Sequence, residues 1–279
     1  MTASCQTRHY MRINDVTFTE LLTLEPHGPD TYVGIAAEYP WVGRLFVGQV
    51  LAQGLRAASH TVNGDRPAHS LHAYFIRPGS PDEPIRYEVE RLRDGRSFAT
   101  RQVVARQSAG AILNLSVSFQ SREPEADVQL AELPADLPSP DAPELEQTGW
   151  GHMLDRRAVP MRRGWAAHWI RLLQEVGDDP ALQACALAFV SDAAPTSAAR
   201  SSHPASAGDR SDRMLFMGAS LDHAVWFHRP TRVEEWHWFD MDSHGLVGGR
   251  GLVTGNVLTA AGVHVATVAQ EVLLRRRRS

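Results

Sequence analysis

The sequence predicts an α+β protein built from two tandem copies of one unit, in which a long antiparallel sheet wraps around a helix. The first observation is a repeat: residues 72–78 are echoed at 225–230, and residues 96–100 are echoed at 250–254, at a separation of about 152 to 154 residues. The second is that, in each copy, an apolar stretch of helix formers precedes several segments rich in β-branched and aromatic residues.

The stretch between the two copies differs in composition from both of them. Residues 123–146 are acidic and rich in proline, which removes backbone donors and discourages regular structure. We therefore expect a first unit at residues 1–122, a linker at 123–146, and a second unit at 147–279.

The first unit is predicted to contain a short strand, a buried helix and an antiparallel meander. Residues 46–58 repeat apolar side chains at helical spacing with strong helix formers between them, which favours a buried helix. The Asp94-Gly95 pair favours a tight hairpin turn, because glycine accepts positive φ. Strands are predicted at residues 31–37, 71–75, 85–92, 97–106 and 111–119.

The second unit follows the same order, with one addition. A helix is predicted at residues 180–190, with Asp178 and Asp179 as N-cap candidates. Residues 193–213 form a Ser-, Ala- and Arg-rich insert that we expect to be mobile. Strands are predicted at residues 168–174, 220–227, 235–242, 251–259 and 263–272. A helix wrapped by a long antiparallel sheet, present twice, is the arrangement of the double hot-dog fold, although the spacing alone fits other units of sheet and helix as well.

Composition limits the classes of function. The net charge of -4 and pI near 6.3 argue against nucleic acid as the main partner. Two cysteines, Cys5 and Cys185, are too few for a disulfide framework or a cysteine-based zinc site. No run approaches 18 apolar residues and no secretory start is present, so we expect a cytoplasmic protein without a membrane segment. The basic run at 275–278 is interpreted as a solvated tail.

The two predicted helices differ in the acid and base groups that they offer. The first contains no Asp, Glu or His and offers only the amides of Gln49 and Gln53, whereas the second carries one carboxylate, Asp192, at its C-terminal end. The helix dipole disfavours a carboxylate at that end, so Asp192 is either an exposed helix end or a functional group. By the repeat, Ser220 corresponds to Ala68 and Gln270 to Ser118. The shared fold therefore does not demand the hydroxyl or the amide, although surface or edge positions would also explain them.

Long ordered motifs occur in both halves, at residues 71–79, 87–90, 92–101, 118–120, 221–230 and 268–271. Together they resemble the type II acyl-CoA thioesterases. The likeness extends from about residue 17 to residue 274. It implies a double hot-dog fold, an acyl-CoA substrate and a homo-oligomer, and it implies no metal or redox cofactor.

The resemblance also implies three catalytic residues in the second unit, where the family holds an attacking water. They are Asp192 in the Ser-Asp pair that ends the helix, Ser220 two residues before an Asp-His pair, and Gln270 before a Glu in the final strand. A thioester carbonyl is already electrophilic, so hydrolysis needs an oriented, partly deprotonated water. An ionised Asp192 would accept the proton, and Ser220 and Gln270 would fix the water or support the oxyanion.

Substrate-binding candidates come from two places in the first unit. The family commonly has two glycines before the helix glutamine, whereas here Gly48 alone precedes Gln49. No phosphate-cradling glycine loop is present, so the CoA phosphates would meet arginines near the hairpin, namely Arg93, Arg96 and Arg101. A solvated turn is the simpler interpretation of these arginines.

These residues also bear on four rival functions. As a serine nucleophile, Ser220 lacks the second glycine of a nucleophile elbow. Asp240, Asp242 and His244 alternate onto one strand face, but no spaced histidine pair accompanies them as a metal site would require. A hydratase would need an Asp and a His at the start of a helix, and neither helix has them. A non-catalytic acyl-CoA binding protein with a degenerate cleft stays open as the alternative.

Overall fold

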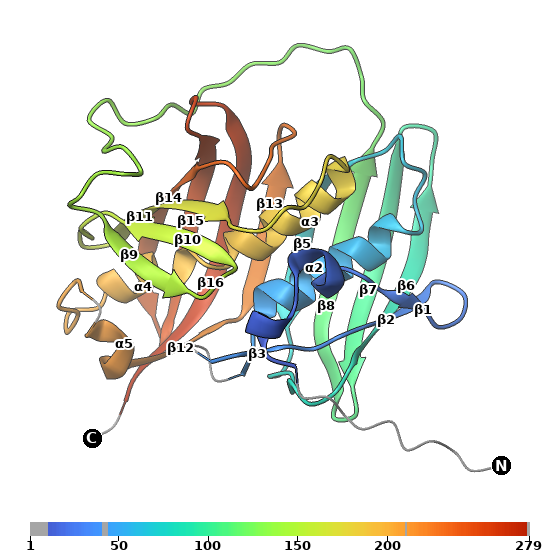
Figure 1. Ribbon diagram of the computed structural model, residues 1–279, viewed down its shortest axis with the longest axis horizontal. Coiled ribbons are helices and arrows are strands. Elements are labelled where there is room, and N and C mark those ends of the chain that lie inside the picture. The colour runs from blue at the N-terminus through green and yellow to red at the C-terminus, as the bar shows by residue number, and fades with distance from the viewer. Residues whose placement is uncertain (1–10, 41–43, 210, 278–279) are drawn as a thin grey trace.

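The computed structural model describes residues 11–40, 44–209 and 211–277 (Figure 1). In the first half, the predicted helix and all the predicted strands are present. The elements of this half are a 3-10 helix (Ile13–Asp15), α1 (Phe18–Leu21), β1 (Glu25–Pro26), β2 (Thr31–Gly34), β3 (Glu38–Tyr39), β4 (Arg44–Leu45), α2 (Val47–Ser59), β5 (Ala68–Phe75), β6 (Ile85–Asp94), β7 (Phe98–Gln107) and β8 (Gly110–Gln120).

The β6–β7 hairpin forms where the sequence predicts it, but for a different local reason. The Gly95 amide donates to the Phe98 carbonyl at 2.8 Å and closes the loop. Positive φ occurs instead at Gly110, where φ is 108°, in the next turn of the meander. Glycine is therefore needed for its backbone conformation at Gly110 rather than at Gly95.

The second half starts directly after the linker. Its elements are β9 (Glu146–Trp150), β10 (Leu154–Ala158), β11 (Trp165–Leu172), α3 (Pro180–Ser191), α4 (Pro195–Ser201), α5 (Asp212–Leu215), β12 (Phe216–Ser220), β13 (Asp222–Phe227), β14 (His237–Val247), β15 (Arg250–Thr259) and β16 (His264–Arg276). Because β16 continues to Arg276, part of the expected basic tail is strand, while Arg278 lies outside the described residues.

One antiparallel sheet of 14 strands joins the two halves. Its order is β1-β2-β6-β7-β8-β5-β13-β16-β15-β14-β11-β10-β9, and β12 also pairs with β16. The two central strands, β5 and β13, are the repeat-related ones, and His72 of β5 lies opposite Ala224 of β13. The duplicated units therefore meet edge to edge around an approximate two-fold relation, which is the double hot-dog fold of the α+β class.

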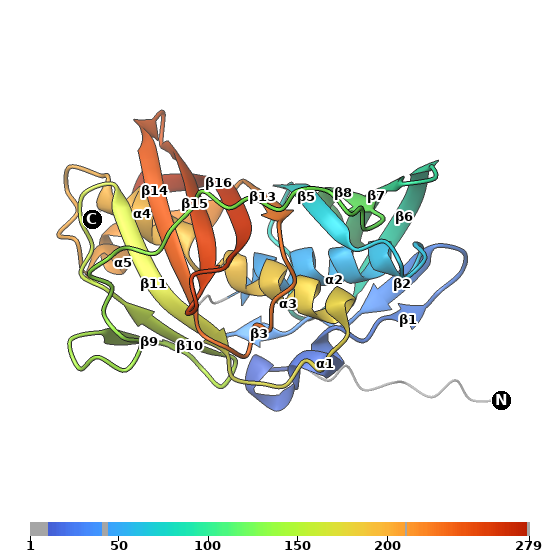
Figure 2. The same ribbon diagram turned by 90° about the horizontal axis from the view of Figure 1, so that it is seen from above.

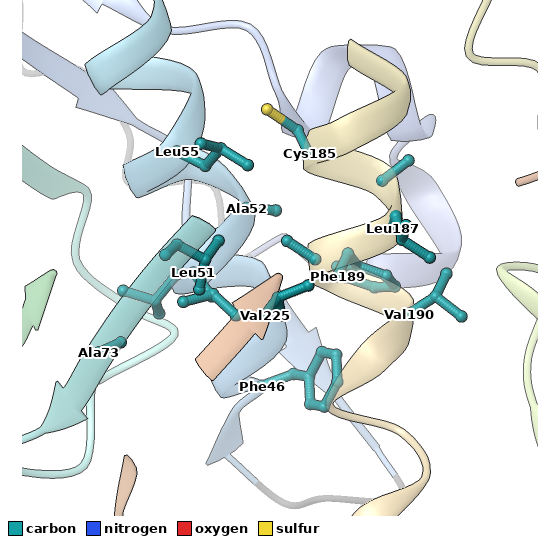
Figure 3. Close-up of a cluster of buried hydrophobic side chains, with 14 of the residues drawn as sticks. Phe46, Leu51, Ala52, Leu55, Ala73, Cys185, Leu187, Phe189, Val190 and Val225 are labelled. Carbon is teal, nitrogen blue, oxygen red and sulfur yellow. The ribbon is translucent and has the colours of Figure 1, made fainter. Parts of the chain in front are cut away.

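Helices α2 and α3 lie side by side on one face of the curved sheet (Figure 2). Apolar side chains fill the space between them, among them Leu51, Leu55, Cys185 and Phe189 (Figure 3). These side chains are fully buried. Cys185 is a free thiol, and burial raises its pKa to about 12, so it is an inert core residue rather than a nucleophile.

Residues 193–213 differ from the prediction of a mobile insert. They contain helix α4, which packs against β11, β14, β15 and β16 with Ala198 and Ala199 fully buried. Because α3 lies beside α2, α4 covers the sheet of the second half, and its small residues allow a close approach. The following loop is tied down by Asp212, whose carboxylate accepts from the Ala207 amide at 2.8 Å. Arg210 lies outside the described residues.

The linker has no helix or strand between residues 121 and 145, but it is anchored to the second half. Gln129 donates to the Gly262 carbonyl at 2.7 Å and accepts from the His264 amide at 2.8 Å. Farther along, Trp169 donates to the Pro138 carbonyl at 2.8 Å. The linker therefore runs over one end of the molecule (Figure 1). Among the residues that the structure describes, no helix has both the length and the apolar character to cross a membrane.

Candidate active site

Asp192 is the C-cap residue of α3 and is 7% exposed. The helix begins with Asp179 as N-cap, whose carboxylate accepts from the Ala181 amide, followed by Pro180 in the first turn. The apolar residues of α3 are buried in the core, which fixes the position of the last turn and of Asp192 after it. A carboxylate at the negative end of a helix dipole is unfavourable unless its surroundings compensate for it.

The start of α2 lies against the end of α3 and supplies part of that compensation. A side chain on Gly48 would come within 2.7 Å of the Phe189 carbonyl oxygen and 2.4 Å of the Phe46 ring. Glycine at position 48 is therefore needed for the two helices to approach this closely. The positive end of the α2 dipole is brought next to the turn that carries Asp192.

The three side chains predicted to be catalytic are in direct contact. Ser220, the last residue of β12, donates from Oγ to Asp192 Oδ1 at 2.9 Å. Gln270, in β16, donates from Nε2 to Ser220 Oγ at 2.9 Å. Gln270 is fully buried and Ser220 is partly buried. The helix end and two strands therefore bring a carboxylate, a hydroxyl and a carboxamide into one hydrogen-bonded chain.

The hydrogen-bonded chain continues through Ser191 and His223, which belong to the sequence motifs around Asp192 and Ser220. His223 Nδ1 lies 2.5 Å from Gln270 Oε1, and His223 Nε2 lies 2.8 Å from Ser191 Oγ. Ser191 Oγ is also 2.9 Å from the Ala188 carbonyl. The sequence signal was present, because Ser191 precedes Asp192 and His223 follows Asp222, but the partners are 32 and 47 residues apart in the chain.

Burial sets the protonation state of this histidine. His223 is 1% exposed, and burial lowers its pKa to about 4, with the hydrogen bond to Gln270 acting in the opposite direction. The imidazole is therefore neutral near pH 7.

Asp222, although adjacent, belongs to the other face of the sheet. Successive side chains of a strand point to opposite faces, so Asp222 faces away from the buried His223. Its Oδ1 accepts from the Glu271 amide at 2.6 Å. Burial raises the pKa of Asp222, while the hydrogen bond from the Glu271 amide lowers it and the Glu271 charge raises it.

The substrate-binding candidates of the first half are divided by burial. Gln49 is fully buried and donates to the Ile35 carbonyl at 2.8 Å. Arg101 is 1% exposed; it donates to Thr61 Oγ1 at 2.7 Å and to Asp94 Oδ1 at 2.5 Å. Its guanidinium is thus engaged inside the protein and cannot meet a phosphate from solvent. Arg93 and Arg96 are exposed at the hairpin.

The remaining candidates do not form a second centre. Asp240 accepts from Trp165 Nε1 at 2.6 Å, and His244 pairs with Thr254 Oγ1 at 2.7 Å. Within the described residues, no group of three or more His, Cys, Asp or Glu side chains is arranged to hold a metal ion.

A cavity of about 1590 Å³ lies near the other end of α3, beneath the linker. It is lined by Pro180, Gln183 and Leu187 of α3, and its lining includes none of Asp192, Ser220 and Gln270. The polar chain is a better guide to the chemistry than cavity size, because it gathers a buried carboxylate with oriented donors.

Comparison with known proteins matches both halves of the chain to one family. The model of the acyl-CoA thioesterase N-terminal domain matches residues 37–120, and that of the acyl-CoA thioesterase C-terminal domain matches residues 130–274. Acyl-coenzyme A thioesterase 8 of Mus musculus is 32% identical over 94% of this chain and 90% of its own. Acyl-CoA thioesterase 2 of Haemophilus influenzae is 33% identical over 83% of this chain and 88% of its own.

A solved structure agrees with these matches over nearly the whole fold. The acyl-CoA thioesterase II TesB2 from Mycobacterium marinum superposes with a TM-score of 0.79 at 34% identity, covering 94% of this chain and 98% of that one. Sequence and structure therefore agree across both duplicated units and the linker between them. The chain belongs to the type II acyl-CoA thioesterase family.

Proposed function

We propose that this protein hydrolyses acyl-CoA thioesters to a free acid and CoA, by attack of a water molecule that Asp192, Ser220 and Gln270 hold. The observation that carries the proposal is the continuous contact from Asp192 Oδ1 through Ser220 Oγ to Gln270 Nε2, each step at 2.9 Å. The repeat does not require these side chains for folding, so their meeting at one point supports a chemical role.

The carboxylate acts as the general base. The water oxygen forms a bond to the carbonyl carbon while one of its protons passes to Asp192. The tetrahedral intermediate then breaks its carbon–sulfur bond, and the proton on Asp192 passes to the departing sulfur, which leaves as the thiol of CoA. A positioned base of this kind contributes about 10² to 10⁴ in rate.

The two neutral residues orient the water and the charge that develops. Gln270 uses one amide hydrogen for Ser220, and an amide nitrogen carries two, so the second serves as a donor to the water or the oxyanion. Ser220 holds Asp192 in place by donating to it. One preorganised donor of this type contributes roughly 10² to 10³ in rate.

The first test is release of free thiol from a panel of acyl-CoA thioesters, which also shows the preferred acyl chain. Asp192→Asn keeps the size of the side chain but removes the base, so kcat falls by about 10² to 10⁴. The matched control is His60→Asn, because His60 is the C-cap residue of α2 as Asp192 is of α3. This control leaves kcat within about threefold.

Two results would count against the proposal. Full turnover by Asp192→Asn would remove the base from the mechanism. Binding of acyl-CoA without thiol release by the unaltered protein would favour the alternative, a non-catalytic acyl-CoA binding protein.

Three further expectations remain predictions. Arg93 and Arg96 are the hairpin arginines exposed enough to meet CoA phosphates, and replacing both with Gln should then raise KM and leave kcat unchanged.

The homo-oligomer is tested by light scattering, and the cytoplasmic location is tested by cell fractionation.

A further inference from the structure

We propose that His223 is a positioning residue that sets the direction of every hydrogen bond in the catalytic chain, by donating from Nδ1 to the carboxamide oxygen of Gln270. The catalytic consequence rests on the proposed function. The protonation pattern itself does not, so the two ideas can fail separately.

The direction follows from what each group can donate. A carboxamide oxygen only accepts, so the Nδ1 atom of His223 must carry the hydrogen in its contact with Gln270 Oε1. This orientation points Gln270 Nε2 at Ser220 Oγ, and an amide nitrogen only donates. The single hydroxyl hydrogen of Ser220 is then free to go to Asp192 Oδ1. Each of these hydrogens then has one possible acceptor, and the last acceptor is the Asp192 carboxylate.

The opposite direction would weaken the contact with Asp192. With the hydrogen on Nε2 instead, the carboxamide would have to turn so that its nitrogen faces His223 and its oxygen faces Ser220. The one hydrogen of Ser220 would then have two acceptors, the Gln270 oxygen and the Asp192 carboxylate. One of these contacts would lose its hydrogen, in the place where the water must be held.

Counting hydrogens shows why the direction needs to be fixed. Five contacts link Asp192, Ser220, Gln270, His223, Ser191 and the Ala188 carbonyl. With a neutral imidazole, Ser220, Gln270, His223 and Ser191 supply one hydrogen each to these contacts, which makes four. One contact must therefore lack a hydrogen.

The missing hydrogen falls at the Ser191 end. The contact with ionised Asp192 is charge-assisted and roughly twice as strong as a neutral one, so the chain keeps it. Ser191 is left to choose between His223 Nε2 and the Ala188 carbonyl. The ring stays neutral because it is enclosed by β5, β16 and α3, and the charged group of the chain, Asp192, is separated from it by Gln270 and Ser220. Burial lowers the pKa of the ring to about 4.

A spectroscopic test needs no turnover. Nitrogen-15 NMR of histidine-labelled protein at pH 7 should show the His223 ring protonated at Nδ1 and unprotonated at Nε2. A spectrum with the hydrogen on Nε2, or with both nitrogens protonated, overturns the inference whether or not the protein hydrolyses thioesters.

The kinetic test uses two amides that copy different ring nitrogens. His223→Asn places an amide nitrogen near the position of Nδ1 and can still donate to Gln270, so kcat should stay within about threefold. His223→Gln places its amide near the position of Nε2 and leaves Gln270 Oε1 without its donor, so kcat should fall roughly 10- to 100-fold. KM should be unchanged in both variants.

A purely structural role gives a different pattern. If His223 only fills the core, each variant loses turnover only to the extent that it loses folded protein, and kcat per folded molecule is the same in both. That result overturns the proposal. His237→Gln is the control, since His237 is also buried but bonds to Thr231 and Glu235 outside the site, and it leaves kcat of the folded fraction unchanged. If the parent protein shows the Nδ1 signature but releases no thiol, the proposed function fails while the inference about His223 stands.

Discussion

The ends of α2 and α3 are the same place in the two halves of the molecule, yet they hold different chemistry. Each helix ends on a serine followed by a polar C-cap residue, His60 after α2 and Asp192 after α3. Past α3 lies the neutral chain of Ser220, Gln270 and His223. Past α2, a buried arginine, Arg101, bonds to Thr61 and Asp94 instead.

Strand pairing identifies which residues occupy equivalent positions. His72 pairs with Ser116 in the first half, as Ala224 pairs with Ala269 in the second. The counterpart of Gln270 is therefore Val117, and not Ser118 as a constant repeat interval suggests, because the interval changes by one residue between these strands. Ser118 faces outward and contacts His69, whereas Gln270 faces the core.

The comparison shows that the two repeated units share a fold but carry different side chains at equivalent positions. The central helix and the strands that pair around it are kept in both halves, whereas inward-facing side chains on those strands differ. The first half carries Leu71, Val117 and Arg101 where the second half carries His223, Gln270 and Val253. The first half therefore lacks the polar chain that the second half carries, and under the proposed function it supports that chain structurally.

Among changes that exchange residues between the two halves, the largest effect is expected from giving position 270 the apolar character of its first-half counterpart. Gln270→Leu removes the donor to Ser220, so kcat falls by about 10² to 10³. Val117→Ala is the matched change in the first half; it lowers stability but leaves kcat of the folded protein unchanged. Thiol release measured on equal amounts of folded protein checks both. Equal losses of kcat would remove the distinction between the two halves.

Acid should weaken the second half through His223. Its folded-state pKa of about 4 lies below the ordinary 6.5, so between these values the unfolded chain binds a proton that the folded protein does not. Protonation of this group therefore lowers the free energy of unfolding by about 3 kcal/mol as the pH falls from 6.5 to 4. Above pH 6.5, His223 adds no pH dependence to the free energy of unfolding.

Replacing His223 with the residue of the first half isolates this contribution. His223→Leu copies Leu71, and denaturant unfolding at pH 7 and pH 4.5 should show a smaller loss of stability in the variant than in the parent. His237, whose pKa burial also lowers to about 4, is unchanged in both proteins and cancels in the comparison. An equal loss in parent and variant would mean that His223 is not held neutral by folding.

The fold could be predicted from the sequence because its helices and strands follow local patterns. The repeat, the helical spacing at α2 and α3 and the β-rich segments each depend on neighbours within one element. Asp192, Ser220 and Gln270 came from motifs of the resembling family, and the structure brings them into contact. Their spacing alone did not indicate that they meet.

The predictions for residues 193–213 and for Arg101 were wrong for specific physical reasons. The Ser-, Ala- and Arg-rich composition of residues 193–213 predicts a mobile insert, whereas tertiary packing buries Ala198 and Ala199 in helix α4. The position of Arg101 near a polar hairpin predicts a contact with CoA phosphates or a solvated turn, whereas the structure buries its guanidinium. The alternation of β7 contained the correct signal, since Arg101 lies between the inward-facing Ala99 and Val103.

Removing Arg101 should cost stability but not catalysis. Arg101→Met keeps the length of the side chain but leaves the Thr61 hydroxyl and carbonyl without its donors, so the free energy of unfolding falls by about 2 kcal/mol. Arg91→Met is the control, because Arg91 also pairs with an aspartate, Asp30, but at the surface, where such a pair contributes about 0 to 1 kcal/mol. Denaturant unfolding measures both. Similar losses would mean that burial of Arg101 adds nothing.

The smallest expected effect tests how each helix begins. Asp179 caps α3 with its carboxylate, whereas α2 starts at Phe46, which makes no side-chain cap bond. Asp179→Ala should lower the free energy of unfolding by about 1 kcal/mol. Asp179→Asn keeps an acceptor for the Ala181 amide and removes only the charge, which lies 3.6 Å from Arg56, so it should cost about 0.3 kcal/mol or less. If the two variants lost the same stability in thermal unfolding, the ion pair to α2 and not the cap would hold the start of α3. In that case the two helices would begin alike, because neither would depend on a side-chain cap.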